Sequence, residues 1–477
     1  MRLEPKNLFT RISKAMNQQQ PQIVGDPDWD GLRPPRLYVA MAALLCGLFF
    51  SVMDGTVCNV ALPTIAQELR IAPADSIWIV NSFQLVIVMM LLPFASLGEL
   101  IGYRKVYLWG LVLFTSGSLA CGLADTFAQL VTARVMQGVG AAMVMSISTS
   151  LIRLIYPKRH LGKGIGLNAT VVALGLVVGP TFTGAVLSYT TWQWLFIINV
   201  PFGVVAWLLA RRSLPDNPTR VVGRRFDPWE ALLNALTFGL FILCFEAFGH
   251  DAAPSVIVAL FVAFFAVLTA YLRMQQRKQF PMLPLDLLRI STFSLSVFTS
   301  IVSFASQMLA MVSMPFLLTH TFGYDAAQTG LLMTSYPVVI LFVAPLAGFL
   351  IDRINPEILG GVGLMILCVG SFLLALMPMD ASFWDIAWRF GVCGVGFGFF
   401  QSPNNHLILT SAPPHRTGSA SGMMASARLI GQTLGAAFVA LFFELFGDRG
   451  PLAAMFFGGV LSLVGMVLSI LRLRHRR

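Results

Sequence analysis

Long apolar stretches dominate this sequence and limit what it can fold into. A window of about 20 residues, the helical length that crosses a bilayer core about 30 Å thick, finds fourteen such stretches. They cover residues 37–63, 76–98, 106–124, 127–152, 164–187, 194–210, 229–249, 254–272, 293–318, 327–351, 358–377, 383–409, 418–443 and 452–471. Only 11% of residues are charged, which leaves too few polar side chains to coat soluble domains. The predicted fold class is an all-α polytopic membrane protein with 14 transmembrane helices.

The net charge of +10 would also fit a nucleic-acid partner, so the distribution of the basic residues matters. Of the 32 Lys and Arg residues, 27 lie in the N-terminal tail, every second loop and the C-terminal end, two lie in the opposite loops, and three lie inside apolar stretches. Because basic loops stay in the cytoplasm, this pattern predicts that both termini are cytoplasmic. The charge therefore reflects membrane topology, and we expect no nucleic-acid partner. Compact loops without an accessible glycosylation sequon favour a bacterial inner (cytoplasmic) membrane.

Glycines repeat along the chain at a fixed offset of 256 residues. The repeated glycines are Gly138, Gly140, Gly162, Gly166, Gly175 and Gly179, which recur as Gly394, Gly396, Gly418, Gly422, Gly431 and Gly435. The copies lie eight stretches apart, an even number, so both halves have the same orientation in the membrane. Transporters built from two parallel halves bind their substrate between the halves near the midplane and work by alternating access.

The repeat also predicts how the chain is divided. Setting aside the seventh and eighth stretches leaves two parallel six-helix bundles plus two extra helices. The predicted units are a cytoplasmic tail (1–36), an N-terminal bundle (37–212), a linker with extra helices 7 and 8 (213–290), a C-terminal bundle (291–471) and a basic cytoplasmic tail (472–477).

Four short motifs point to a known family. They are Asp54-x-Thr56-x-x-Asn59-x-Ala61-Leu62-Pro63, Arg134-x-x-Gln137-Gly138-x-Gly140, Gly175-x-x-x-Gly179-Pro180-x-x-x-Gly184 and Trp192-Gln193-Trp194-x-Phe196-x-x-Asn199-x-Pro201-x-Gly203. From about residue 37 to its end, the chain thereby resembles the fourteen-span drug:proton antiporter branch of the major facilitator superfamily. The third motif is similar to the antiporter motif C, and the resemblance implies export. The spacing of its glycines alone indicates tight helix packing.

The loop after the second stretch resembles the cytoplasmic gating loop of the same family, with departures. Glu99, Gly102 and Arg104 fit the family pattern, whereas Leu100 stands where the family has an arginine. The corresponding loop of the second half keeps both charged residues of the family pattern, Asp352 and Arg353. The resemblance implies gating roles for these residues and leaves the strength of the cytoplasmic latch open.

Asp54 and Arg134 are charged residues inside apolar stretches, where a charge at the bilayer centre costs at least about 2.5 to 3.5 kcal/mol. Counted from the outer helix ends, they lie roughly 13 Å and 10 Å deep, so they can meet. Burial raises the pKa of a carboxylate and a neighbouring arginine lowers it, which is the balance that a proton carrier needs. We therefore predict that the two residues couple transport to protons. The alternatives are a permanent structural ion pair, and an arginine that only ties helices together through carbonyl groups.

Five further polar residues inside apolar stretches are candidates for the substrate cavity: Gln84, Gln137, Gln307, Arg389 and Arg428. Gln137 shares a helix face with Arg134. Gln307 lies roughly where the repeat places Asp54, and Arg389 pairs with Arg134 after a slip of one residue. Arg428 lies roughly 15 Å from the cytoplasmic end of its helix, where it can attract an anionic group or pack against a carbonyl.

The leading hypothesis is a proton-coupled secondary active exporter of small hydrophobic or amphipathic compounds such as drugs and antimicrobials. The alternatives are a dedicated metabolite exporter and a transporter of the same fold that works in another direction. A membrane receptor or an intramembrane enzyme fits less well. His406 is the only histidine inside an apolar stretch, and no nucleophile pairs with it, so we expect no enzymatic activity. The expected partners are the lipid bilayer, a small-molecule substrate and protons. No cofactor beyond the proton gradient and no metal are expected, and a periplasmic adaptor protein is left open.

Overall fold

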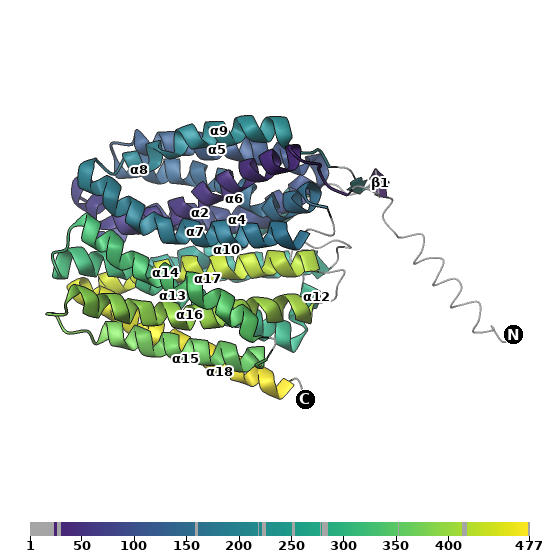
Figure 1. Ribbon diagram of the computed structural model, residues 1–477. Coiled ribbons are helices and arrows are strands. Elements are labelled where there is room, and N and C mark those ends of the chain that lie inside the picture. The colour runs from purple at the N-terminus through teal and green to yellow at the C-terminus, as the bar shows by residue number, and fades with distance from the viewer. Residues whose placement is uncertain are drawn as a thin grey trace.

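A bundle of long helices forms the body of the protein. The computed structural model describes residues 23–25, 30–157, 161–217, 219–221, 226–249, 253–276, 278, 285–351, 353–412 and 417–475. Thirteen of the predicted stretches each fall mainly on one long helix, and the stretch 194–210 covers the short helix α8 and most of α9. The long helices lie side by side with their ends at two opposite faces of the molecule (Figure 1). They are α2 (Arg36–Leu69), α4 (Trp78–Ile101), α5 (Tyr103–Gly122), α6 (Phe127–Ile155), α7 (Leu161–Tyr189), α9 (Asn199–Ser213), α10 (Pro228–Gly249), α11 (Pro254–Gln276), α13 (Ser291–Phe316), α14 (Ala326–Leu350), α15 (Pro356–Ala375), α16 (Phe383–Ser411), α17 (Thr417–Phe446) and α18 (Gly450–His475).

Short elements connect the long helices. They are β1 (Ile23–Gly25), α3 (Pro73–Ser76), α8 (Trp194–Ile197), β2 (Thr219–Val221), α12 (Leu285–Leu288), a π-helical turn η2 (Leu317–Thr321) and a 3₁₀ turn η4 (Gly447–Arg449). The all-α fold class is confirmed. The one addition among the described residues is a short antiparallel ladder of β1 and β2, in which Ile23 pairs with Val221. Three-residue strands are too short to be detected with a hydropathy window of membrane-spanning length.

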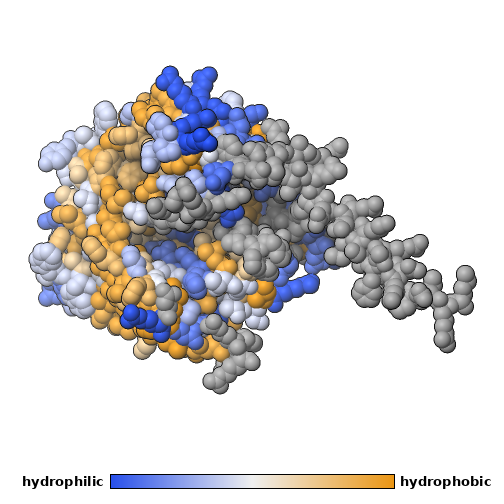
Figure 2. Space-filling model, turned by 45° about the vertical axis from the view of Figure 1, so that its right-hand side comes forward, coloured by the Kyte–Doolittle hydropathy of each residue, from blue (hydrophilic) through white to orange (hydrophobic). Residues whose placement is uncertain are grey.

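Length and composition identify the protein as an integral, multi-pass membrane protein. Within the described residues, 10 segments are long and apolar enough to cross a membrane, one of which spans both α17 and α18. The count of fourteen crossings therefore stays a prediction. Large apolar side chains cover the flank of the bundle (Figure 2). On α11, Val258, Val262 and Phe265 are each more than half exposed, at 61%, 64% and 57%. Such a surface fits lipid and not water.

The glycine repeat corresponds to a repeat in packing. Gly140 in α6 lies against the backbone of Gly110 and Phe114 in α5, and Gly396 in α16 lies against Gly363 and Leu367 in α15. A Cβ atom at either glycine would collide with the neighbouring helix backbone. Small residues at such contacts let membrane helices approach closely. The helix starts match as well, since Thr126 caps α6 and Ser382, 256 residues later, caps α16.

The two extra helices attach to the core through polar side chains. Helix α10 packs against α4, α17 and α11, and Asn234 of α10 donates a hydrogen bond to the carbonyl of Met89 in α4 (2.8 Å). Tyr271 of α11 donates to Asn234 (3.0 Å). At the end of the pair, Lys278 bonds Asp227 (2.7 Å) and Glu230 (2.6 Å), and its hydrogen bond holds the pKa of Asp227 below its ordinary value. Helix α10 therefore bridges one helix of each half.

We predict that Gly396→Ala destabilises the protein, because its methyl group would be forced into the backbone of α15. Overpacking of this kind costs about 1–3 kcal/mol. The matched control is Gly348→Ala in α14, where an added Cβ meets nothing within 4 Å. Thermal unfolding of the purified variants in detergent should show a lower midpoint for Gly396→Ala only. Equal midpoints for the two variants would contradict the packing argument.

Candidate functional site

Asp54 and Arg134 form an ion pair inside the N-terminal bundle. Nη1 of Arg134, on α6, donates to Oδ2 of Asp54, on α2, and the two side chains are 0% and 1% exposed. Nε of Arg134 also donates to the carbonyl of Ile79 in α4 (3.0 Å). The guanidinium carbon lies 4.0 Å from the centre of the Phe83 ring, also in α4. The arginine of α6 thus contacts both α2 and α4, through the carboxylate of Asp54 and the carbonyl of Ile79.

Neutral donors complete the surroundings of Asp54. Its Oδ1 accepts from Nε2 of Gln137 (2.9 Å) and from Nδ2 of Asn199 (3.0 Å), on α9. Gln137 in turn accepts from Arg134 (2.6 Å) and donates to Ser118 in α5 (2.7 Å). We call these five residues the Asp54 cluster.

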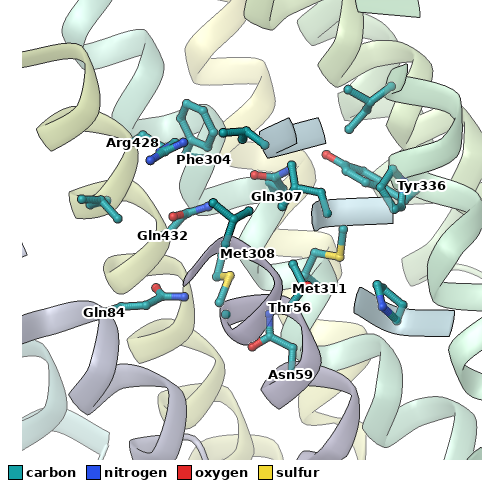
Figure 3. A pocket seen from close by; sticks show the side chains of 18 of the residues that line it. Thr56, Asn59, Gln84, Phe304, Gln307, Met308, Met311, Tyr336, Arg428 and Gln432 are labelled. Atoms are coloured by element: carbon teal, nitrogen blue, oxygen red, sulfur yellow. The ribbon is translucent and has the colours of Figure 1, made fainter. Parts of the chain in front are cut away.

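A cavity opens between the two bundles, next to this cluster. About 1090 Å³ of space not filled by atoms lies in it and at its mouth, and this volume includes open solvent. Its walls come from α2, α4, α6 and α7 of the first half and from α13, α14, α16 and α17 of the second (Figure 3). Most of the lining is apolar and includes several methionine and phenylalanine side chains, and a smaller number of polar side chains lie between them.

The five predicted cavity residues fall into three groups. Gln84, Gln307 and Arg428 line the cavity. Gln137 belongs to the Asp54 cluster and is fully buried behind the wall. Arg389 needs a correction, because it lies outside the cavity and bonds Asp385 (3.2 Å) and the carbonyl of Leu373 (2.9 Å). The slip of one residue explains this, since a step of one residue turns a helical side chain by about 100°.

The repeated glycine contacts also show which residue of the second half is equivalent to Asp54. Gly179 lies against the carbonyl of Met53, and its copy Gly435 lies against the carbonyl of Ala305, so the residue equivalent to Asp54 is Ser306 and not Gln307. Ser306 is buried and donates to the carbonyl of Gly458 in α18 (2.8 Å). The sequence prediction missed the register by one residue, although it was correct that the second half has no carboxylate there.

The motif around Gly175, Gly179 and Pro180 lies at a contact between the two halves. Gly175 and Gly179 pack closely against α2. Farther along α7, the carbonyl of Pro180 lies against Gly330 in α14, and the hydroxyls of Thr181 and Thr334 are 2.5 Å apart. These residues join α2 to α7 and α7 to the second half, which fits the packing role that the spacing indicated.

The predicted gating loop is held by the end of its own half. Gly102 adopts a φ of 107°, a conformation that favours glycine, at the turn between α4 and α5. Arg104 pairs with Asp216 (3.1 Å) and donates to the carbonyl of Arg211 (2.6 Å), and Asn217 accepts from the backbone N–H of Tyr103 (2.9 Å). The loop between α4 and α5 is therefore bound to the end of α9 and to the segment that follows it, contacts that the sequence did not indicate.

The remaining gating candidates are less informative. Glu99 is exposed at the end of α4. Arg353 is exposed and lies 5.2 Å from the centre of the Phe349 ring. Asp352 lies outside the described residues.

A second buried polar group was missed because its arginine was assigned to the tail. Helix α18 continues through Arg472, which is 1% exposed and donates to Ser296 (2.9 Å), Asn404 (2.8 Å) and Ser469 (2.8 Å). This corrects the predicted start of the C-terminal tail at residue 472. Asn404, a polar residue inside an apolar stretch, was the one signal that could have located this cluster.

We predict that Asp54→Asn lowers the stability of the fold, because it leaves Arg134 buried without a counter-charge. Breaking a buried pair in this way costs about 3–5 kcal/mol. The matched control is Asp385→Asn, which breaks the part-exposed pair with Arg389 (29% and 14% exposed), where about 0.2–1 kcal/mol is expected. The measurement is the unfolding midpoint of each purified variant in detergent. An Asp54→Asn protein as stable as the control would show that the buried pair contributes little.

Comparisons with known proteins agree with this architecture. The sequence profile of the Major Facilitator Superfamily matches residues 44–298 and 296–477. The uncharacterized transporter YebQ of Escherichia coli (strain K12) is 47% identical over 448 residues, which cover 94% of this chain and 98% of YebQ. The multidrug resistance protein Stp of Mycobacterium tuberculosis (strain CDC 1551 / Oshkosh) is 30% identical over 82% of this chain and 72% of its own length.

Among solved structures, a bacterial homolog of the human lysosomal transporter Spinster, in an inward-facing conformation, shares the fold. Its TM-score is 0.68 at 18% sequence identity, and the alignment covers 93% of this chain and 98% of that one. With the two parallel bundles, the cavity between them and the profile match over both halves, the chain belongs to the Major Facilitator Superfamily of membrane transporters.

Proposed function

We propose that the protein is a proton-coupled exporter of small hydrophobic or amphipathic compounds, and that it works by alternating access. The observation that carries this proposal is the position of the Asp54 cluster, one helix width from a cavity that lies between the two bundles. A titratable carboxylate with a tuning arginine and a nearby substrate cavity are the two parts that an antiporter has to connect.

Helix α2 connects the two parts in this proposal. Asp54 points from α2 into the N-terminal bundle, whereas Gly55, Thr56 and Asn59 of the same helix line the cavity. Protonation of Asp54 would remove the charge that holds Arg134, and deprotonation would restore it. Arg134 also bonds α4 through Ile79, so the loss of this charge would loosen the contacts of α2 with α4 and α6 together. Substrate in the cavity and proton on Asp54 would then act on the same helix from opposite sides.

The cavity supports small amphipathic substrates. It is bordered by methionines such as Met308 and Met311, whose flexible side chains adapt to ligands of different shape. Export is the direction that motif C implies, and Stp, a relative with a similar sequence over most of this chain, is a multidrug resistance protein. We place the protein in a bacterial inner membrane with both termini in the cytoplasm, from the distribution of its basic loops.

Transport in proteoliposomes with an imposed pH gradient tests the proposal. The parent protein should move dyes or antimicrobials against their gradient, and Asp54→Asn should reduce this transport to the level of empty liposomes. Asp54→Glu, which keeps a carboxylate, should retain coupled transport at a lower rate, and Asp385→Asn should behave like the parent. Comparison of Asp54→Asn with Asp54→Glu separates the loss of a titratable group from the loss of the folded state.

A second readout is the proton released when substrate is added to the detergent-solubilised protein in weak buffer. The parent should release protons on binding and Asp54→Asn should not. If Asp54→Asn transports with the same gradient dependence and the same proton release as the parent, the proton role of Asp54 is wrong. A parent protein that transports one metabolite and none of the panel would point to the dedicated exporter instead.

A further inference from the structure

We propose that Arg428 forms an anion subsite in the cavity, so that the transported compounds carry a negatively charged group, such as a carboxylate or sulfonate, on an apolar aromatic body. This inference rests on the proposed function, because it names the class of compound that the cavity would take. It starts from the charges of the cavity wall.

Arg428 is the only residue with a formal charge among the described residues that line the cavity. No ion pair between residues that the structure describes includes it, and its Nε is buried without a hydrogen-bond partner. A guanidinium inside a membrane protein is normally paired with an acid or with carbonyl groups, since an unpaired buried charge is costly. A ligand that brings a negative charge would supply the missing partner.

Polar groups near Arg428 can bind an anion together with it. Gln432, one helical turn further along α17, and Gln84 of α4 also line the cavity, and Figure 3 shows both amides on the same side of the cavity as Arg428. Amide N–H groups and a guanidinium all donate hydrogen bonds to carboxylate or sulfonate oxygens. Asp54 cannot balance the charge of a cationic ligand in the cavity, because its side chain is buried on the other side of α2 and is paired with Arg134.

The apolar part of the ligand has a place beside this subsite. Phe304 of α13 packs against Gly431 of α17, three residues after Arg428. Met308 and Met311 also line the cavity, and Figure 3 shows them between the side of Arg428 and that of Tyr336 of α14. An aromatic ring system bound there could contact Phe304 and the methionine sulfur atoms. The charged group would then face Arg428 and Gln432, which fixes the orientation of the ligand.

A pair of matched probes tests the subsite without transport. Anilinonaphthalenesulfonate and phenylnaphthylamine share the same ring body, and only the first carries a sulfonate. Their binding is measured by fluorescence titration of the full-length protein in lipid nanodiscs, with the signal of empty nanodiscs subtracted. The parent protein should bind the sulfonate at least about tenfold more tightly than the neutral probe, the difference that one charge-assisted contact supplies.

Three variants assign the preference to Arg428. Arg428→Gln should weaken binding of the sulfonate about tenfold and leave the neutral probe unchanged, whereas Arg428→Lys should keep most of the preference. Arg389→Gln removes the same charge from α16 outside the cavity and should bind both probes like the parent. Size-exclusion profiles and unfolding midpoints establish that each variant is folded.

Several outcomes would overturn the subsite. They are equal affinity of the parent for both probes, no binding of the sulfonate by the parent, an equal loss for both probes in Arg428→Gln, and no change in Arg428→Gln. The first two are read from the parent alone, so they hold even if a variant fails to fold. Because binding is measured without a pH gradient, failure of the subsite and failure of proton-coupled export give different results.

Discussion

The buried pair of Asp54 and Arg134 is the interaction on which the interior of the N-terminal bundle depends. Neither charge is stable there alone, since the surroundings are apolar and water is excluded. Gln137 and Asn199 donate hydrogen bonds to Asp54, and Arg134 donates to the carbonyl of Ile79. Nη2 of Arg134 is buried without a hydrogen-bond partner among the described residues. The helices α2, α4, α6 and α9 are therefore tied to the charge state of one carboxylate. A bundle packed only by apolar contacts would have no such dependence.

The two halves share their packing and differ in their chemistry. Equivalent glycines make equivalent helix contacts in both halves, yet the positions of Asp54, Arg134 and Gln137 are taken by Ser306, Phe390 and Cys393 in the second half. Among the described residues that line the cavity, Arg428 of the second half carries the one formal charge. Duplication thus supplied two similar frames, and substitution placed the titratable pair in one and the cavity cation in the other. In the function that we propose, this division places the proton site and the substrate site apart.

The sequence predicted the parts of the structure that follow from periodicity, and missed those that depend on the direction of single side chains. Apolar length located the helices, the glycine offset located the repeat, and the cost of buried charge singled out Asp54 and Arg134. Arg389 was misplaced because one residue of slip rotates a side chain out of the cavity. Asn199 stood in a recognised motif, but only the fold brings α9 next to Asp54. Arg472 was read as tail because a charge next to an apolar stretch looks the same whether its helix ends or continues.

Helix α2 gives the shortest physical connection between the titratable pair and the closure of the two halves. Gly179 of α7 packs on α2 beside Thr56, close to Asp54 and at the wall of the cavity. The two residues after Gly179 contact α14, Pro180 through its carbonyl and Thr181 through its hydroxyl. With no side chain at Gly175 or Gly179 to absorb a shift, a displacement of α2 must move α7 or separate from it. Movement of α7 changes its contact with α14, which belongs to the other half. In the mechanism that we propose, a change of charge at Asp54 would therefore alter the contact between the halves through two helix interfaces, without a long chain of intermediate residues.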